Sequence, residues 1–125
     1  MFRSLFALVL GASVAFAAEF ADISASDLQK AIADKTVTIL DCNGSKSFAK
    51  GRVPGALDFE AVKGDLAKHL PTDKNALVVA YCGSPRCTAY EGGLNAAKEL
   101  GYTNLKHLSI GIKGWKKDNL PVESN

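Results

Sequence analysis

ALVVAYCGSPRCTAYEGGLNAAKELG, residues 76–101, is the stretch that decides the fold. Its first seven residues, 76–82, are almost entirely apolar, which is typical of a central strand covered on both faces. Five loop residues follow Cys82, and Thr88 with Glu91 predicts a capping box that opens a helix ending at Leu100, before Gly101. The stretch therefore predicts a strand, a tight loop and a helix, which is the repeating unit of a parallel sheet.

The same alternation continues on both sides of this stretch. Ser24 and Asp27 form a capping box for a helix over residues 25–34, and a short helix through Phe48 ends at Gly51. Further strands are expected at residues 20–24, 36–42, 56–59 and 104–108, and further helices at residues 60–69 and 112–118. Strands alternating with helices predict an α/β fold with a mainly parallel sheet.

The N-terminal residues have the pattern of an export signal. Arg3 precedes the apolar run LFALVLGASVAFA, and Ala15 and Ala17 place small residues at a cleavage spacing. The run is too short to span a bilayer, which takes about 20 residues. We therefore expect residues 1–17 to be a cleaved signal peptide and residues 18–125 to be one domain. A periplasmic or secreted location follows, with no membrane attachment after cleavage.

Composition narrows the class of protein. The 125 residues are 47% hydrophobic and 22% charged, which excludes disorder, and 15 basic against 13 acidic residues leave a net charge of +2. No basic block is present, so nothing indicates a nucleic-acid partner. Three cysteines are too few for a disulfide scaffold, and their odd number leaves at least one unpaired in an oxidising compartment.

Cys82 is the candidate nucleophile. It ends the strongest strand, and ligands of open parallel sheets lie beyond the carboxyl ends of the strands. A loop that leads into a helix N-terminus stabilises a thiolate, and Arg86 adds a positive charge suited to an oxyanion. The alternative is that Cys82 only packs the strand end. The residues expected to bind substrate are Gly83, Ser84, Pro85, Arg86, Cys87 and Thr88.

Two segments together resemble the rhodanese family, over nearly all of residues 20–124. DCNGSKSFAKGRVPGALDFE, residues 41–60, resembles the family's strand-end aspartate followed by a G-H-I-P-G-A turn. Residues 81–123 resemble its active-loop half, with the GY-x-N-V and G-x-x-x-W signatures. The resemblance implies about five strands with helices on both faces. It also implies that Cys82 accepts sulfur as a persulfide from a small donor such as thiosulfate and passes it to a thiol or cyanide, without a cofactor.

The sequence departs from the family pattern at several positions. Rhodaneses usually carry arginine five residues after the cysteine, whereas here Arg86 stands at plus four and Cys87 at plus five. Asn43 stands where an arginine often follows the aspartate, Arg52 replaces the histidine of the turn, and Ile110 stands where a paired glycine usually begins. Related phosphatases need a loop one residue longer with arginine six after the cysteine, so the loop length favours sulfur transfer.

The other cysteines leave alternative functions open. Cys42 ends strand 36–42, so it is either a resolving thiol for Cys82 or a buried small hydrophobe. Cys87 either resolves Cys82 or packs the loop. A periplasmic thiol-disulfide redox protein using Cys82 with Cys87 or Cys42, and a non-catalytic binding domain, are therefore the rivals of sulfur transfer. No spacing fits a zinc site, so His69 is expected to be a surface residue near a helix end and His107 a structural residue of a strand. The sequence does not identify a protein partner.

Overall fold

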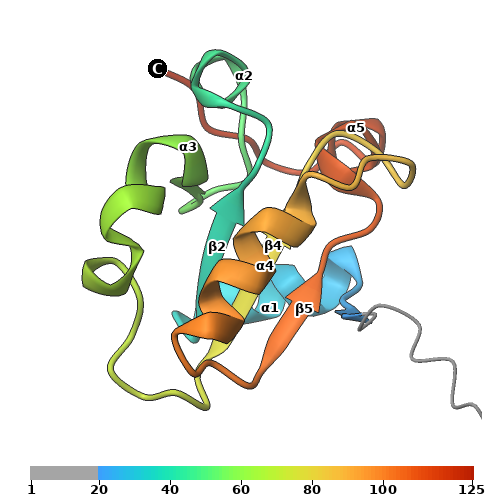
Figure 1. Cartoon of the computed structure of the whole chain (residues 1–125). Helices are drawn as coiled ribbons and strands as arrows, with labels where there is room; N and C mark the ends of the chain where they lie inside the picture. The colour runs from blue at the N-terminus through green and yellow to red at the C-terminus, as the bar shows by residue number, and fades with distance from the viewer. Residues whose placement is uncertain (1–19) are drawn as a thin grey trace, which may run out of the picture.

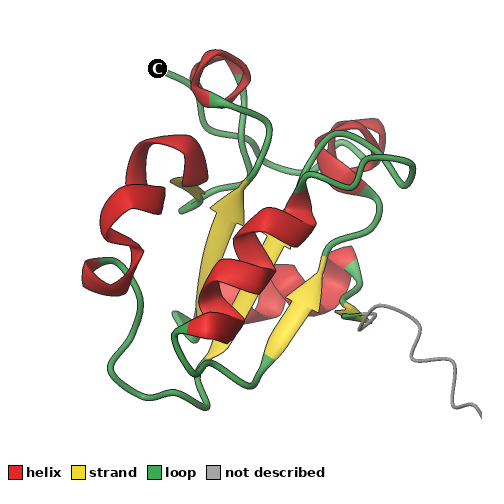
Figure 2. Ribbon diagram, viewed as in Figure 1, coloured by secondary structure: helices red, strands yellow, loops and turns green. Residues whose placement is uncertain are grey.

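The computed structural model describes residues 20–125, and the expected signal peptide, residues 1–17, lies outside them. Its centre is a five-stranded sheet in the order β1-β5-β4-β2-β3, and every pair of neighbouring strands is parallel. Figure 2 shows the longer strands pointing the same way. The strands are β1 (Ala21–Asp22), β2 (Val37–Asp41), β3 (Leu57–Asp58), β4 (Leu77–Tyr81) and β5 (Leu105–His107). The expected α/β fold with a parallel sheet is confirmed.

Helices cover both faces of this sheet (Figure 1). One face is covered by α1 (Ala25–Asp34) and α5 (Gly111–Lys117), and the other by α4 (Tyr90–Glu99) together with α3 (Phe59–Val62) and η1 (Lys63–Lys68), a 3-10 helix. The short helix α2 (Ser45–Lys50) lies beyond the carboxyl ends of the strands, beside the C-terminus (Figure 1).

The residues of β4 alternate between two apolar cores. Val79 and Tyr81 belong to the core that contains Trp115, on the side of α1 and α5. Val78 and Ala80 belong to the core on the side of α4. All four side chains are fully buried, so β4 is the central strand that its apolar run predicts. Burying each large side chain of this kind contributes about 1.5–3 kcal/mol to the stability of the fold. The end of β4, which Cys82 follows, is therefore held firmly in place.

The first helix begins and ends as predicted. The Ser24 hydroxyl accepts a hydrogen bond from the Asp27 N–H at 3.0 Å, which satisfies one of the unpaired amides of the first turn. Leu28 is the fully buried residue of this helix. Lys35 ends it in a left-handed conformation and donates its own N–H back to the last turn.

Two expectations about helices were wrong. The single helix expected over residues 60–69 is α3 followed by η1, and η1 is itself interrupted at Asp65, where φ is −139°. Gly64 stands at this break and disfavours a continuous helix. The capping box of Thr88 and Glu91 is absent as well: α4 starts at Tyr90, and its N-cap has no side-chain hydrogen bond.

The late start of α4 has a local cause. The Cys87 N–H donates to the Ser84 carbonyl at 3.0 Å, which closes a turn inside the loop, and Cys87 is bonded to Cys82. These two constraints fix the residues directly before the expected helix entry at Thr88, and α4 begins two residues later, at Tyr90. Thr88 still contributes through its backbone, because its carbonyl accepts the Glu91 N–H at 3.0 Å.

Candidate active site

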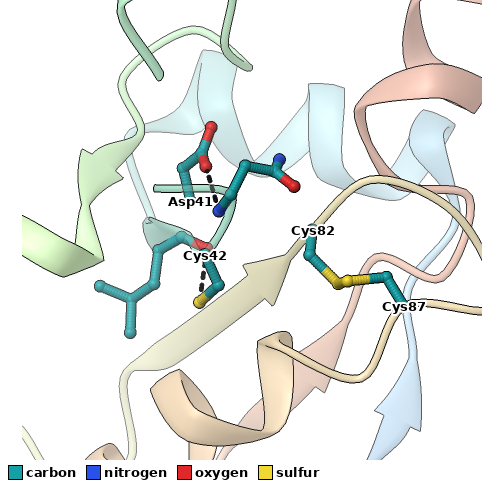
Figure 3. Close-up of a disulfide and its surroundings, with 6 residues drawn as sticks. Asp41, Cys42, Cys82 and Cys87 are labelled. Atoms are coloured by element: carbon teal, nitrogen blue, oxygen red, sulfur yellow. Dashed lines mark hydrogen bonds between the residues drawn. A yellow bond between two sulfur atoms is a disulfide. The ribbon is translucent and has the colours of Figure 1, made fainter. Parts of the chain in front are cut away.

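The candidate site lies at the carboxyl end of the two central strands. Cys82 follows β4 directly and Cys42 follows β2, and the Cys42 N–H donates to the Tyr81 carbonyl at 2.9 Å. Figure 3 shows the two cysteines at this edge of the sheet, together with Asp41 and Cys87. We call residues 82–88 the thiol loop.

Cys82 and Cys87 are joined as a disulfide (Figure 3). Their Cα atoms are 6.2 Å apart, which lies within the range that a disulfide spans. Cys82 is buried and Cys87 is half-buried. Of the two roles left open for Cys87, the structure therefore pairs it with Cys82. In this oxidised form the Cys82 sulfur is not a thiolate, so Cys82 cannot act as a nucleophile until the disulfide is reduced.

The first turn of α5 holds the thiol loop in place. The Ile112 N–H donates to the Cys82 carbonyl at 2.9 Å, and the Lys113 N–H donates to the Gly83 carbonyl at 3.0 Å. Gly111 makes this approach possible because its φ is +63°, and a Cβ there would lie 2.6 Å from the carbonyl carbon and oxygen of Gly83. Sequence reasoning did not identify Gly111 as a residue of the site.

Several backbone N–H groups of the thiol loop have no protein acceptor. Within residues 20–125, the N–H groups of Gly83, Ser84, Arg86 and Thr88 donate no hydrogen bond. Neighbouring free amides in a tight turn, here those of Gly83 and Ser84, are suited to an anion. At the start of the loop, the carbonyls of Cys82, Gly83 and Ser84 all accept hydrogen bonds, so this part of the loop offers donors.

The side chains that the sequence assigned to substrate binding face outward or lie half-buried. Pro85, Arg86 and Thr88 are exposed, and Gly83 and Ser84 are half-buried. In the described part of the chain, Arg86 forms no ion pair. Its guanidinium is consequently available to a ligand from solvent, and it does not hold the loop together.

Asp41 stabilises the strand ends beneath the loop. It is almost fully buried, and its carboxylate accepts the Tyr81 hydroxyl at 2.6 Å and the Asn43 N–H at 2.9 Å. The Tyr81 hydroxyl in turn accepts the Val53 N–H at 3.0 Å. Burial raises the pKa of Asp41, and the two hydrogen bonds oppose that rise. Burial and the neighbouring carboxylate also raise the pKa of Tyr81. Asp41 thus fixes the backbone that follows β2, through Asn43.

Cys42 is a free, half-buried thiol packed against α4. Its Sγ lies 3.8 Å from the Leu40 carbonyl, and a Cβ on Gly93 would lie only 2.8 Å from it. Burial, with the nearby Asp41 carboxylate, raises the pKa of Cys42 to about 12. The thiol is therefore protonated at neutral pH, which suits the buried-hydrophobe interpretation rather than a resolving role. The contact also explains Gly93, for which the sequence offered no reason.

Arg52, which replaces the histidine of the family's turn, is engaged elsewhere. Its guanidinium donates to the Phe48 carbonyl at 3.1 Å and to the Asn125 side chain at 2.9 Å, and it lies over the Phe48 ring. Its backbone pairs with Glu123 in an antiparallel bridge. Arg52 thus fastens the C-terminal residues over α2.

Neither histidine lies in a metal-binding arrangement. His107 stacks on Tyr90 with ring centroids 3.3 Å apart, and its buried Nε2 has no hydrogen-bond partner in the described residues. Burial lowers the pKa of His107 and so favours the neutral ring. His69 lies 3.3 Å from Asp65 at the far end of η1. Across residues 20–125, no three potential metal ligands cluster together.

None of the helices formed by residues 20–125 has the length and apolar character needed to cross a membrane.

A parallel sheet with a cysteine loop at the end of its central strand defines a class of α/β proteins, and sequence comparison identifies the family. The Rhodanese-like domain family matches residues 24–118. Because this match covers most of the chain, the protein belongs to the rhodanese-like domain family. The family resemblance inferred from the sequence motifs is confirmed.

Solved structures of low sequence identity share the fold. A rhodanese-related protein from Thermoplasma volcanium is 19% identical, with a TM-score of 0.63 over 85% of this chain and 100% of that one. The 3-mercaptopyruvate sulfotransferase SseA of Escherichia coli is 18% identical, with a TM-score of 0.68 over 86% of this chain and 51% of that one. A thiosulfate sulfurtransferase from Pseudomonas aeruginosa is 21% identical, with a TM-score of 0.68 over 86% of this chain and 20% of that one. The chain thus spans about half of the first transferase and a fifth of the second.

Proposed function

We propose that this protein is a sulfurtransferase that moves sulfane sulfur from a small anionic donor, such as thiosulfate, to a thiol or cyanide through a persulfide on Cys82. The position of Cys82 is the observation that carries the proposal. It stands at the end of the central strand and at the start of a loop with unpaired backbone N–H groups. Family membership and the fold shared with solved sulfurtransferases support it.

The chemistry needs the reduced loop and no cofactor. The Cys82 thiolate attacks the outer sulfur of thiosulfate, the sulfur–sulfur bond of the donor breaks, and the electron pair leaves with sulfite. The free amides of the loop stabilise the thiolate and the persulfide anion that replaces it. An acceptor thiol or cyanide then attacks the outer sulfur and restores the thiolate.

Intact-mass measurement of the reduced protein after treatment with thiosulfate tests the proposal. We expect release of sulfite and, when the adduct is trapped early, one added sulfur atom. Cys82→Ser should release no sulfite, whereas Cys42→Ser should behave like the wild type because the Cys42 thiol is half-buried and protonated. Equal loss in the two variants would contradict the assignment of Cys82 as the single nucleophile.

Arg86 is proposed to attract the anionic donor. Because its side chain is exposed, removing one charge should slow persulfide formation only about two- to fivefold, the effect of roughly 0.5–1 kcal/mol. Lys63→Ala, on η1, is the matched control for loss of a surface charge. An Arg86→Ala rate equal to that of the control would exclude a role for Arg86 in donor binding.

The disulfide favours a second candidate, a thiol-disulfide redox protein that cycles Cys82 and Cys87. An oxidising location suits this candidate, and we propose a periplasmic or secreted one on the pattern of residues 1–17. A redox protein of this kind would exchange electrons with dithiols and form no persulfide with thiosulfate, so the mass measurement separates the two candidates.

A further inference from the structure

We propose that Cys87 attacks the Cys82 persulfide and releases its outer sulfur as hydrosulfide, so that the domain converts thiosulfate and its own dithiol into sulfite, hydrosulfide and the Cys82–Cys87 disulfide. This inference rests on the proposed persulfide on Cys82. It adds a second activity to the same loop, sulfide release, with a dithiol as the second substrate class.

The disulfide in the structure is the expected product of this step. Cys87 lies five residues beyond Cys82, and the two Cα atoms are 6.2 Å apart. The loop reaches this state with its supports intact, because α5 still donates to the carbonyls of Cys82 and Gly83. Since these hydrogen bonds coexist with the disulfide, the fold can accommodate bond formation between the two sulfurs without giving up the frame of the loop.

The step balances in atoms and electrons. The Cys87 thiolate attacks the Cys82 Sγ, the bond from that Sγ to the outer sulfur breaks, and the electron pair leaves with the outer sulfur as hydrosulfide. In this step the outer sulfur is reduced by one electron and the Cys87 sulfur is oxidised by one, while the Cys82 sulfur keeps the oxidation state that it reached when the persulfide formed. No external oxidant takes part. A dithiol reductant then reopens the disulfide by exchange and readies the loop for the next donor molecule.

Cys87 competes well with an acceptor from solution. A thiol on the same loop has an effective concentration in the millimolar range or above, which exceeds that of a dilute external acceptor. Cys42 does not compete, because it is protonated at neutral pH and packed beneath Gly93. The thiol at the family's usual arginine position therefore diverts sulfur toward sulfide when acceptor is scarce.

A single-turnover experiment tests the inference. The full chain is reduced, freed of reductant without air and mixed with thiosulfate, and then sulfite, sulfide and intact mass are measured. The wild type should release about one sulfite and one sulfide per protein and end as the disulfide, without bound sulfur. In Cys87→Ser, and in Cys87→Ala as a second variant, sulfide should fall at least tenfold while the persulfide persists on Cys82. Cys42→Ser is the control and should match the wild type.

The readouts separate this inference from the proposed function. Sulfite release with a stable wild-type persulfide and no sulfide would overturn the inference and leave sulfur transfer standing. Added sulfur found on Cys87 would overturn it too, because attack would then have taken the outer sulfur. Equal sulfide from the wild type and both Cys87 variants would show that Cys87 is not the attacking thiol. Absence of sulfite in the wild type would overturn both proposals.

Discussion

Replacing Gly111 with alanine should disturb the thiol loop more than any other single methyl group added in this region. Gly111 has a φ of +63°, and a left-handed conformation costs an alanine about 1–2 kcal/mol. The added Cβ would also lie 2.6 Å from the Gly83 carbonyl group, closer than real contacts allow, so α5 and the loop must separate. Weakening the two hydrogen bonds between them costs about 0.5–1.5 kcal/mol each. We expect a total destabilisation of about 2–5 kcal/mol.

Substitutions at two other glycines separate the two contributions to the destabilisation, the backbone conformation and the steric clash. Gly55 has a φ of +80° with open space around it, so Gly55→Ala carries the conformational cost without the clash. Gly64 has neither a left-handed φ nor a near neighbour, so Gly64→Ala should be neutral or slightly stabilising. Urea denaturation of the three variants, in the oxidised form, should rank them Gly64→Ala, Gly55→Ala and Gly111→Ala in order of increasing destabilisation.

The functional consequence of Gly111→Ala follows from the same displacement. A shift of the loop backbone by several tenths of an ångström to 1 Å misplaces the Cys82 sulfur relative to its amides, and misplacements of this size cost up to about 10²-fold in rate. We expect persulfide formation from thiosulfate to slow at least tenfold in Gly111→Ala and to stay near the wild-type rate in Gly55→Ala. Equal stability losses in these two variants, with equal persulfide rates, would refute the contact between α5 and the loop as the support of the site.

Two further predictions concern the buried polar groups under the loop. Tyr81→Phe leaves the Asp41 carboxylate and the Val53 N–H each without one partner, so it should cost about 2–5 kcal/mol in urea denaturation. The pKa of Asp41 is raised in the folded state, so ionisation of Asp41 lowers the free energy of unfolding as pH rises through that value. Loss of the Tyr81 hydroxyl removes a hydrogen bond that lowers this pKa, so it raises the pKa further. The difference in stability between Tyr81→Phe and the wild type should therefore grow from acidic to neutral pH. Cys42, with its pKa of about 12, should resist iodoacetamide at neutral pH in the reduced protein, and Gly93→Ala should destabilise the fold in a way that Cys42→Ala partly restores.

The structural features that could be predicted from the sequence are those that depend on residues close together in the chain. The apolar run through Tyr81 predicts a strand buried on both faces, and a strand followed at once by a loop and a helix places Cys82 at the sheet edge. Ser24 predicts the start of α1 for the same local reason, since its hydroxyl bonds an amide three residues away.

The features that escaped sequence reasoning join residues far apart in the chain. Tyr81 bonds Asp41 across 40 positions and Val53 across 28, and no periodicity encodes either pair. Gly111 meets Gly83 only because α5 returns to the carboxyl end of β4. Where a local signal failed, as at Thr88, a constraint from outside the expected helix had taken its place: the bond between Cys82 and Cys87.

The exchange of an arginine for Cys87 has a physical consequence for the whole site. A guanidinium at that position would contribute fixed charge for binding an anion, whereas a thiol contributes none at rest and removes the nucleophile when it bonds to Cys82. Arg86, one place earlier, is exposed and supplies only a screened charge. In the proposed sulfur transfer, donor binding must then rely more on the free backbone amides of the loop, which do not depend on side-chain identity. We therefore expect such a site to bind its donor more weakly but to contain its own reducing thiol, Cys87. It should work fastest where a supply of dithiols keeps Cys82 and Cys87 reduced.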